Sequence, residues 1–467
     1  MTADHTPPIT QALGLAAQAL FLSSPNPRVG CVITAPDGRV LGEGFTQQVG
    51  GPHAEVVALR AAQAAGHDVR GATAYVTLEP CAHQGRTGPC CDALIAAGIG
   101  KVVASLEDPN PLVAGQGFAR LRAAGVAVEV GPGAAAAREL NIGFFSRMVR
   151  GTPWVRLKVA ASLDGTTALH NGASQWITSA AARADGHAWR ARACAVLTGI
   201  GTVLADNPVL NVREVPTPRQ PQLVVVDSRL QTPPDASLFI PGRTCTIYAA
   251  GTFDRKFSAR KAMLEARGAT VVHLPGADGK VDLPAMLRDL AARGVNELHI
   301  EAGHRLNGAL VRAGLVDELL LYLAPNLLGP GRGMADMGPL ETLAQGLALH
   351  MQHQGIERPT TLYWGARRPQ DLYLHHEVQA LLEQMPQLRY VPVVSDALPE
   401  DGWTGRTGFV HQAVLDDFAD LSNFQVYACG APIVVESART SYTSTRGLPA
   451  EAFFADAFTS EADKHGG

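Results

Sequence analysis

The sequence predicts an α/β protein with two successive domains and a shorter third region, and three observations support this. The chain has 467 residues, which is long for a single hydrophobic core and favours two to four domains. Hydrophobic residues make up 46% and charged residues 18%, a balance typical of folded globular proteins. Strand-like and helix-like segments alternate in two series, which indicates α/β layers.

The first series covers about 145 residues, and turn residues separate its elements. Pro36-Asp37-Gly38 suits a hairpin turn because glycine tolerates a positive φ, and Gly66 suits a helix end. We expect helices over 11–22, 53–66, 90–100 and 118–125. We expect a strand, turn and strand over 28–45 and single strands over 73–80, 101–109 and 126–131.

The second series starts near residue 152 and ends between residues 330 and 350. We expect strands over 153–165, 222–228, 245–250, 270–275, 297–303 and 318–325. We expect a helix leading into a strand over 179–199, and helices over 285–294 and 306–314. The pattern then changes, with strand-like segments over 360–373, 389–396, 424–432 and 453–460 and a loose tail over 461–467.

Charge and cysteine usage narrow the classes of function. The net charge is −4 without a long basic run, so bulk electrostatics does not favour a nucleic-acid partner. The first residues lack the basic and apolar pattern of a signal peptide, and no apolar run reaches membrane-spanning length. Seven cysteines without framework spacing argue against a disulfide scaffold. Cytoplasmic residence is the expected default, and a homo-oligomer is left open.

One stretch carries metal-ligating residue types at the ends of predicted elements. His53 and Glu55 begin a predicted helix. Cys81 follows a strand, and Cys90 opens the next helix. One nitrogen and two sulfur ligands suit Zn²⁺, which in catalytic sites keeps a fourth position for water and lowers the pKa of that water. A glutamate beside such a site is typical of zinc deaminases, where it moves protons.

Alternatives remain at this site. Each residue alone is more often a loop histidine or a buried cysteine, and only the grouping at element ends favours a metal site. Cys91 is adjacent to Cys90, but the position after Gly88-Pro89 favours Cys90 as the ligand and leaves Cys91 to the core. His83 is a further candidate for a contact near the metal or the substrate.

The spacing of the two cysteines is longer than the usual Pro-Cys-x-x-Cys. "PNPRVGCVI", "PHAE", "ATAYVTLEPCAH", "CCDALIAAG" and "DPNP" resemble the deaminase domain of the bifunctional riboflavin-biosynthesis enzymes, over essentially all of residues 10–148. The resemblance implies a cytidine deaminase-like three-layer α/β/α domain with one Zn²⁺ per chain. It implies deamination of 2,5-diamino-6-ribosylamino-4(3H)-pyrimidinone 5′-phosphate, with Asn26 facing the base.

The chain departs from this family pattern at three positions. Thr46 and Gln84 stand where the family often has histidine, and Gly88 stands where it usually has proline. The zinc ligands survive these changes, and substrate contacts through the loop are left open.

A second group of motifs resembles the reductase half of the same family. "LKVAASLDGTTALHNGASQWITS", "TGIGTVLADNPVLNVR", "VVVDS" and "HIEAGHRLNGALV" cover about residues 150–335. The resemblance implies a dihydrofolate reductase-like α/β domain that uses NADPH to reduce the ribosylamino sugar to a ribitylamino chain. From the residues alone, the glycines of "IEAGHRLNG" suit either a phosphate-binding helix start or a tight structural turn.

The resemblance implies two sets of contact residues. Those expected at NADPH are Ala160, Trp176, Thr202, Asp206, Ser228, Gly303, His304, Arg305, Leu306, Asn307, Gly308 and Ala309. Those expected at the substrate are Ser174, Arg190, Leu210, Arg213 and Glu301. Because guanidinium groups bind phosphate oxygens in pairs, Arg190 and Arg213 are candidate phosphate clamps, with solvated surface arginines as the alternative.

Departures occur in this half too. Thr166 replaces a usual basic residue, Asn211 replaces threonine, and His304 replaces proline. Loss of the basic residue would weaken cofactor binding, and Asp164 is expected to organise its loop rather than to react.

The third region, over about residues 350–460, resembles the nucleotide-binding end of ferredoxin–NADP reductase-like flavoenzymes. "TLYWGARRPQDLY", "WTGRTGFVHQAVL", "VYACGAP" and "GLPAEAFFADAFT" carry the resemblance, which implies a partial Rossmann-like segment. The leading glycine loop and the flavin-binding element of that family are missing from the sequence. This favours a non-catalytic remnant over an electron-transfer module or an interaction role. The final strand of the reductase is then either missing or supplied by residues 361–364.

Together these expectations give a bifunctional enzyme with a fused fragment. We expect a zinc-dependent pyrimidine deaminase domain over 1–148, an NADPH-dependent reductase domain over 149–348 and the flavoenzyme-like fragment over 349–467. The alternatives are a deaminase with a disabled reductase half, a nucleobase deaminase of another pathway and a catalytically inactive binding protein. The attached reductase and the lack of a basic stripe argue against nucleic-acid bases as substrates.

Overall fold

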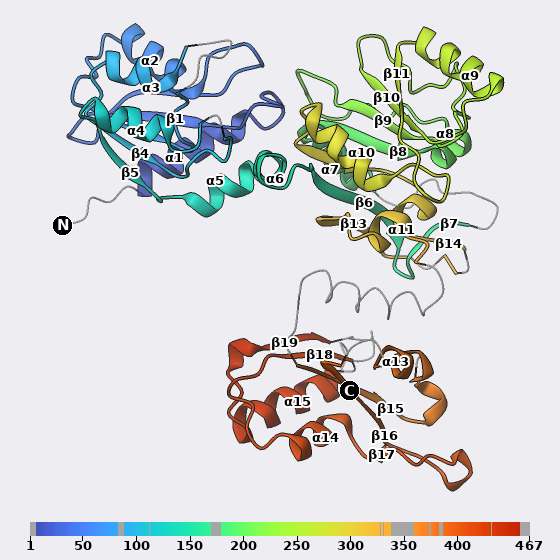
Figure 1. Cartoon of the computed structure of the whole chain (residues 1–467). Helices are drawn as coiled ribbons and strands as arrows, with labels where there is room; N and C mark the ends of the chain where they lie inside the picture. The colour runs from blue at the N-terminus through green and yellow to red at the C-terminus, as the bar shows by residue number, and fades with distance from the viewer. Residues whose placement is uncertain are drawn as a thin grey trace. The chain divides into compact units, whose positions relative to one another are not determined.

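The structure is a computed structural model, and it describes residues 6–82, 88–111, 113–169, 179–326, 328–329, 331–337, 359–372, 375–382, 386–430 and 432–457. It divides into two compact units, Met1–Asp336 and Met337–Gly467. The first unit contains two α/β domains in succession (Figure 1). None of the helices within the described ranges has the length and apolarity that crossing a membrane requires.

The first domain is a sheet with helices on both faces. Its described strands are β1 (Gly30–Thr34), β2 (Val40–Phe45), β3 (Thr73–Val76), β4 (Lys101–Ala104) and β5 (Ala127–Val130). They lie in the order β2-β1-β3-β4-β5. β1 is antiparallel to β2 and β3, and the last three strands are parallel. The helices are α1 (Thr6–Gln18), α2 (Ala54–Ala64), α3 (Cys90–Ala96) and α4 (Gln116–Ala123).

Glycines let α1 and α2 approach opposite faces of this sheet. A Cβ at Gly30 would lie 1.9 Å from the carbonyl oxygen of Ala12 in α1. A Cβ at Gly44 would lie 2.5 Å from the carbonyl oxygen of Ala54, the first residue of α2. Because Gly44 pairs with Cys31, the residue after Gly30, the two contacts fall on opposite faces. The predicted three-layer arrangement is confirmed, and the start of α2 is held directly against the sheet.

Two helices that the sequence analysis did not predict connect the domains. They are α5 (Ala134–Leu140) and α6 (Ile142–Arg150). α6 packs closely on the second domain, because a Cβ at Gly143 would lie 2.4 Å from Cγ of Glu297. The connection is therefore a packed helical segment rather than an extended linker.

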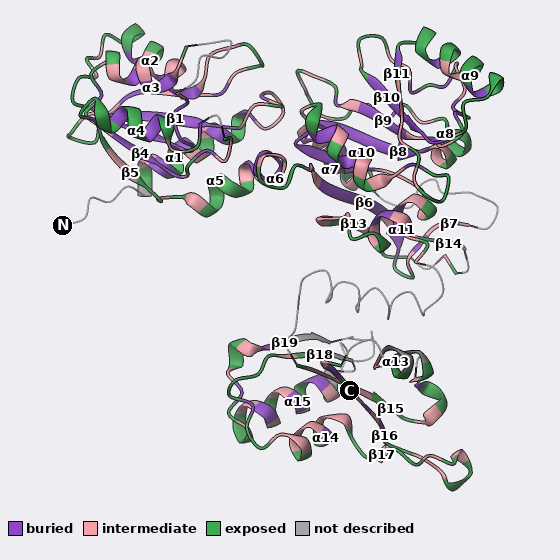
Figure 2. Ribbon diagram, in the orientation of Figure 1, coloured by how far each residue is buried: buried purple, intermediate pink, exposed green. Residues whose placement is uncertain are grey.

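The second domain is built on a parallel sheet whose central strands are largely buried (Figure 2). Its described strands are β6 (Trp154–Ser162), β8 (Ala195–Gly199), β9 (Gln222–Val226), β10 (Cys245–Ala249), β11 (Ala269–His273), β12 (Glu297–Ile300) and β13 (Glu318–Ala324). They lie in the order β11-β10-β9-β8-β12-β6-β13. The helices are α7 (Ala180–Arg192), α8 (Ile200–Asp206), α9 (Arg255–Ala266), α10 (Leu283–Ala292) and α11 (His304–Arg312). A short pair, β7 (Thr166–Leu169) and β14 (Gly331–Gly333), lies beside this sheet.

The second unit contains two small parallel sheets within its described residues. β15 (Thr360–Ala366), β16 (Leu388–Val394) and β17 (Arg406–Thr407) form one, and β18 (Val426–Gly430) pairs with β19 (Phe453–Ala457). The helices are α13 (His375–Leu382), α14 (Val410–Asp417) and α15 (Pro432–Thr445). Residues 361–364 pair with β16 along the whole of β15. In the sheet of the second domain, β13 is the edge among the described strands.

Candidate active sites

The first candidate site joins the predicted metal ligands. Nδ1 of His53 lies 3.6 Å from Sγ of Cys81 and 3.3 Å from Sγ of Cys90, and the three ligand atoms all lie within 4.8 Å of one another. Tetrahedral Zn²⁺ with its usual bond lengths of about 2.0–2.3 Å holds such atoms roughly 3.5 Å apart. The donor set and its spacing therefore fit zinc.

Local structure explains why these atoms converge. His53 precedes α2, and Cys90 is the first residue of α3. The backbone N–H of Cys90 donates to Sγ of Cys81 over 3.4 Å. The neighbouring Cys91 is fully buried among the apolar side chains of the first domain. The structure thus brings Cys90, and not Cys91, to His53.

The thiols and the adjacent carboxyl group have displaced pKa values. The pKa of Cys81 is lowered to about 4, chiefly by hydrogen bonding from Cys90, whereas the pKa of Cys90 is raised, first by that bond and then by burial. Burial raises the pKa of Glu55 to about 7, and this side chain is 3% exposed. A buried carboxyl group that titrates near neutrality can both accept and donate a proton.

A buried carboxylate fixes the segment that faces this site. Both oxygens of Glu79, two residues before Cys81, accept backbone N–H groups from the chain beyond β4 and from the start of α4. The donors are Asp108, Gly115, Gly117 and Phe118, at 2.8–3.2 Å. Burial raises the pKa of Asp108 to about 7, and Glu79 and Cys81 add to this. Asp108 lies in the quoted "DPNP" motif, but the sequence analysis gave it no role.

The other residues singled out in this half have these positions. Asn26 is half-buried in the loop between α1 and β1, and its backbone N–H donates to the carbonyl oxygen of Ser23 over 2.8 Å. Thr46 is buried, and its Oγ1 accepts a hydrogen bond from the N–H of Val29. His83 and Gln84 lie outside the described residues.

The second candidate site is a cavity of about 1950 Å³ in the second domain. It lies at the carboxyl ends of β8, β9 and β12, the edge at which open α/β sheets bind ligands. Its volume exceeds the roughly 300–1,000 Å³ of a typical ligand pocket, so it has room for a dinucleotide and a second substrate. Most predicted contact residues of the reductase half line it: Ala160, Arg190, Thr202, Asp206, Leu210, Arg213, Ser228, Glu301, Gly303, His304, Arg305, Leu306, Asn307 and Ala309.

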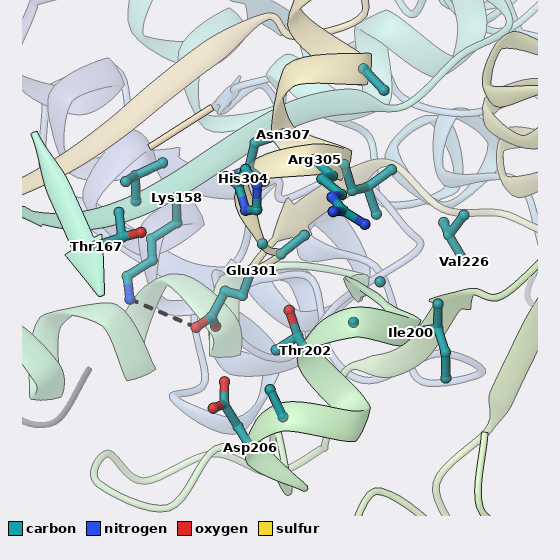
Figure 3. A pocket seen from close by; sticks show the side chains of 18 of the residues that line it. Lys158, Thr167, Ile200, Thr202, Asp206, Val226, Glu301, His304, Arg305 and Asn307 are labelled. Carbon is teal, nitrogen blue, oxygen red and sulfur yellow. Dashed lines mark ion pairs between the residues drawn. The ribbon is translucent and has the colours of Figure 1, made fainter. Parts of the chain in front are cut away.

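A carboxylate that faces three basic groups occupies this cavity. Glu301 pairs with Arg190, and Nζ of Lys158 lies 3.7 Å from its Oε2 (Figure 3). Nε2 of the buried His299 lies 3.4 Å from its Oε1. Burial would raise the pKa of Glu301, but Arg190 outweighs it and the pKa lies well below its usual range. An ionised carboxylate is therefore available inside the cavity.

Lys158 and His187 are polar lining residues that were not predicted from the sequence. Lys158 lies two residues beyond Arg156 on β6. Because alternate residues of a strand point to the same side, this spacing of two basic residues could have indicated a charged face. His187 lies on α7, where Nη1 of Arg190 is 3.5 Å from its Nε2 and the N–H of Arg213 donates to its Nδ1. Burial, followed by Arg190 and Arg213, lowers the pKa of His187 to about 4.

The glycine-containing helix start also faces the cavity. α11 begins at His304, with Gly303 in extended backbone before it. The free N–H groups of such a start attract phosphate groups. Gly308 is not among the residues that line the cavity. A Cβ there would lie 1.9 Å from the carbonyl oxygen of Asp336. Its role in the structure is close packing against the chain after β14.

The remaining residues singled out in the sequence of this half lie after β6. Asp164 accepts hydrogen bonds from Ser162 and from the backbone N–H groups of Leu328 and Gly329, so it organises its loop. Oγ1 of Thr166 donates to the carbonyl oxygen of Gly329 over 2.9 Å. Ser174 and Trp176 lie outside the described residues.

Comparison with protein families gives three matches. Residues 4–106 match the cytidine and deoxycytidylate deaminase zinc-binding region. Residues 153–361 match the RibD C-terminal domain, and residues 327–440 match an oxidoreductase NAD-binding domain.

Curated relatives and solved structures agree with these matches. The chain is 46% identical to riboflavin biosynthesis protein RibD of Escherichia coli over 350 residues, which is 72% of this chain and 92% of the relative. It is 42% identical to the Haemophilus influenzae RibD, over 72% of this chain and 90% of the relative.

Two solved structures are similar. RibD of Acinetobacter baumannii has a TM-score of 0.62 and 42% identity over 70% of this chain and 89% of that one. A Thermotoga maritima protein described as a diaminohydroxyphosphoribosylaminopyrimidine deaminase and 5-amino-6-(5-phosphoribosylamino)uracil reductase has a TM-score of 0.62 and 32% identity. That match covers 70% of this chain and 88% of the other.

Proposed function

This chain belongs to the RibD family of riboflavin biosynthesis proteins, and from this premise we propose that it catalyses two successive reactions. The first is hydrolytic deamination of 2,5-diamino-6-ribosylamino-4(3H)-pyrimidinone 5′-phosphate. The second is NADPH-dependent reduction of the ribosyl group to ribityl. The observation that carries the proposal is the convergence of His53, Cys81 and Cys90 beside a buried glutamate.

The first domain, which we call the deaminase half, supplies ligands and a proton carrier. His53, Cys81 and Cys90 would hold Zn²⁺, which provides water that ionises near neutral pH. Glu55 would accept a proton from water and return it to the ring nitrogen and the departing amine. Its pKa of about 7 suits both steps. Asn26 would contact the base.

The second domain, the reductase half, binds and orients two ligands in one cavity. NADPH supplies the hydride, and the protein mainly positions the two reactants. Thr202, Asp206 and the helix start at Gly303 would contact the cofactor. Arg190 and Arg213 would hold the phosphate of the nucleotide, with Glu301 and Lys158 beside the sugar.

The third region lies in the second compact unit, Met337–Gly467. We propose that it is a non-catalytic remnant of a nucleotide-binding fold fused to the enzyme, and its match to an oxidoreductase NAD-binding domain supports this origin. Cytoplasmic residence and a homo-oligomeric state stay predictions.

The test supplies the purified chain with the diaminopyrimidinone nucleotide, with and without NADPH. Ammonia release and NADPH oxidation are followed separately. We expect ammonia in both cases, and oxidation only after ammonia has been released. Ammonia without oxidation would limit the activity to the deaminase half. Oxidation without ammonia would contradict the proposed order of the two reactions.

A further inference from the structure

The loop that carries Asn26 is bonded to the reductase half on one side. Oγ of Ser24 lies 2.8 Å from Sγ of Cys194. The carbonyl oxygen of Pro25 accepts a hydrogen bond from Nδ2 of Asn296 over 2.7 Å. Both partners lie at strand starts in the reductase half, Cys194 before β8 and Asn296 before β12. The residue expected to contact the pyrimidine therefore lies next to two contacts with the other catalytic half.

On the other side of Asn26, Arg28 makes a stronger set of bonds. Its Nη1 lies 2.5 Å from Oε1 of Glu297, and its Nη2 donates to the carbonyl oxygen of Arg192 over 3.2 Å. Its backbone N–H donates to Oδ1 of Asn141, which lies between α5 and α6, over 2.7 Å. One buried arginine thus joins the loop, the connecting helices and the reductase half.

Glu297 is the common acceptor at this junction. It is 1% exposed and also pairs with Arg156 at 3.1 Å and Arg192 at 2.7 Å. Burial would raise its pKa, but the guanidinium groups of Arg28, Arg192 and Arg156 together lower it to about 2. The carboxylate is therefore ionised, and removing any one arginine leaves it with fewer compensating charges.

Directional bonds distinguish this junction from an apolar contact. A buried ion pair contributes little more stability than well-packed apolar residues would, because desolvation offsets much of the attraction. Guanidinium–carboxylate geometry, in contrast, fixes orientation. The absent side chain of Gly143 lets α6 approach Glu297 closely, so the junction has little room to shift. Such an arrangement suits a loop that must be held in one position.

We propose that the reductase half is part of the deaminase substrate site, with Arg28 and Asn296 as positioning residues that hold the Asn26 loop for the pyrimidine. This inference rests on the proposed deaminase function and on the expected contact of Asn26 with the base. Small displacements of positioning groups reduce rates on the order of 100-fold. Loosening the junction should therefore weaken use of the pyrimidine without disturbing the metal ligands.

The principal test is Asn296→Asp in the full chain. The carboxylate keeps an acceptor for Nε of Arg147, which now donates to Oδ1 of Asn296, but it loses the donor to Pro25. We expect the KM for the nucleotide in ammonia release, measured without NADPH, to rise on the order of 10-fold. Zinc content and NADPH oxidation with the deaminated nucleotide should stay unchanged. Arg28→Met should raise the same KM further.

Arg150→Met is the matched control. Arg150 pairs with Asp317 at 2.6 Å and so also joins α6 to the reductase half, but it makes no described contact with residues 23–28. This variant should keep the wild-type KM. An unchanged KM in Asn296→Asp and Arg28→Met, or an equal rise in Arg150→Met, would overturn the inference. If wild-type protein releases no ammonia, the proposed function fails instead, so the two failures are distinguishable.

Discussion

Glu55 has the most specific task among the individual residues, because it is the carboxyl group beside the candidate metal ligands. Replacing it in Glu55→Gln removes the proton carrier but keeps size and polarity. We expect ammonia release to fall by about 10²–10⁴-fold, the usual contribution of a general acid–base group. Metal analysis should still find about one zinc per chain, as a catalytic site with three ligands predicts.

NADPH oxidation with the deaminated nucleotide is the internal control for that variant, and its rate should match that of wild type. A Glu55→Gln protein that deaminates at the wild-type rate would rule out the assigned role. A protein that has lost its zinc would show that Glu55 acts through the ligands instead.

The adjacent cysteines provide a matched pair of substitutions. Sγ of Cys90 lies 3.3 Å from Nδ1 of His53, whereas Cys91 is buried in the core. We expect Cys90→Ser to lose zinc and ammonia release, since a hydroxyl group is a poor replacement for a thiolate ligand. Cys91→Ser should keep its zinc and lose some stability by burying a hydroxyl group. Equal zinc content in the two variants would contradict the ligand assignment.

The sequence allowed some of these residues to be predicted and not others. His53, Cys81 and Cys90 carry distinctive chemistry at the ends of local elements, and the structure brings them together as expected. Lys158 and His187 were missed because their roles depend on contacts between distant segments. Arg190 and Glu301, which they adjoin, are 111 positions apart. A single sequence does not reveal such pairings.

At the scale of elements, β12 links the two halves. Glu297, His299 and Glu301 occupy alternate positions along the strand and its exit, and so point to one side. Glu297 binds Arg156 and Arg192, and Glu301 faces Lys158 and Arg190. Arg156 and Lys158 are two positions apart on β6, and Arg190 and Arg192 are two positions apart at the end of α7.

This arrangement predicts a specific acid sensitivity. The pKa of Glu297 is lowered from 4.5 to about 2, so its contribution to stability is complete above pH 4.5 and is lost as the pH falls towards 2. A shift of this size corresponds to roughly 3 kcal/mol. Glu297→Gln should therefore be less stable than wild type at pH 7, and the difference should shrink between pH 4.5 and 2. Urea unfolding at a series of pH values measures this.

Glu265→Gln on the exposed face of α9 is the control for acid unfolding. This side chain is 44% exposed, and its loss should change stability by no more than about 0.5 kcal/mol. If Glu297→Gln behaves like this control across the pH series, the buried carboxylate does not have the stabilising role inferred from its partners.

Element prediction succeeded where periodicity was clear and failed where helices were short or lacked a regular pattern. The strands of the main sheets in the first and second domains were expected close to their observed positions. α5, α6, α8 and α9 were missed, and so were α13, α14 and α15 in the third region. Alanine-rich "AAAAREL" and charged "RKFSARKAMLEA" show no clear separation of apolar and polar faces, so hydrophobic periodicity gives little signal.

At the scale of the whole molecule, the two compact units have separate apolar cores. The core of the second unit includes Leu421, Tyr442 and Phe453. We expect urea unfolding to show two transitions. NADPH at 100 times its dissociation constant should stabilise only the first unit, by about 2.7 kcal/mol.

Tryptophan fluorescence can separate these transitions. The second unit contains Trp364 and Trp403, and a variant with both changed to phenylalanine should report the first unit alone. A single transition that NADPH shifts for every probe would contradict independent units.

The third region shows where sequence reasoning reaches its limit. Its flavoenzyme-like motifs correctly indicated a nucleotide-binding fold. The matches to the RibD C-terminal domain and to the NAD-binding domain overlap over residues 327–361, so local pattern alone did not decide to which fold residues 361–364 belong. In the structure β15 pairs with β16 within the second unit, a tertiary contact that the local sequence pattern does not reveal.

The four backbone bonds accepted by Glu79 have a practical consequence for work with this protein. They anchor the turn that precedes Cys81 through hydrogen bonds within the protein. Dialysis against a chelator should therefore leave a folded apoprotein in which the metal-binding residues keep their positions. Adding zinc back should restore activity at the speed of simple binding, with no refolding delay.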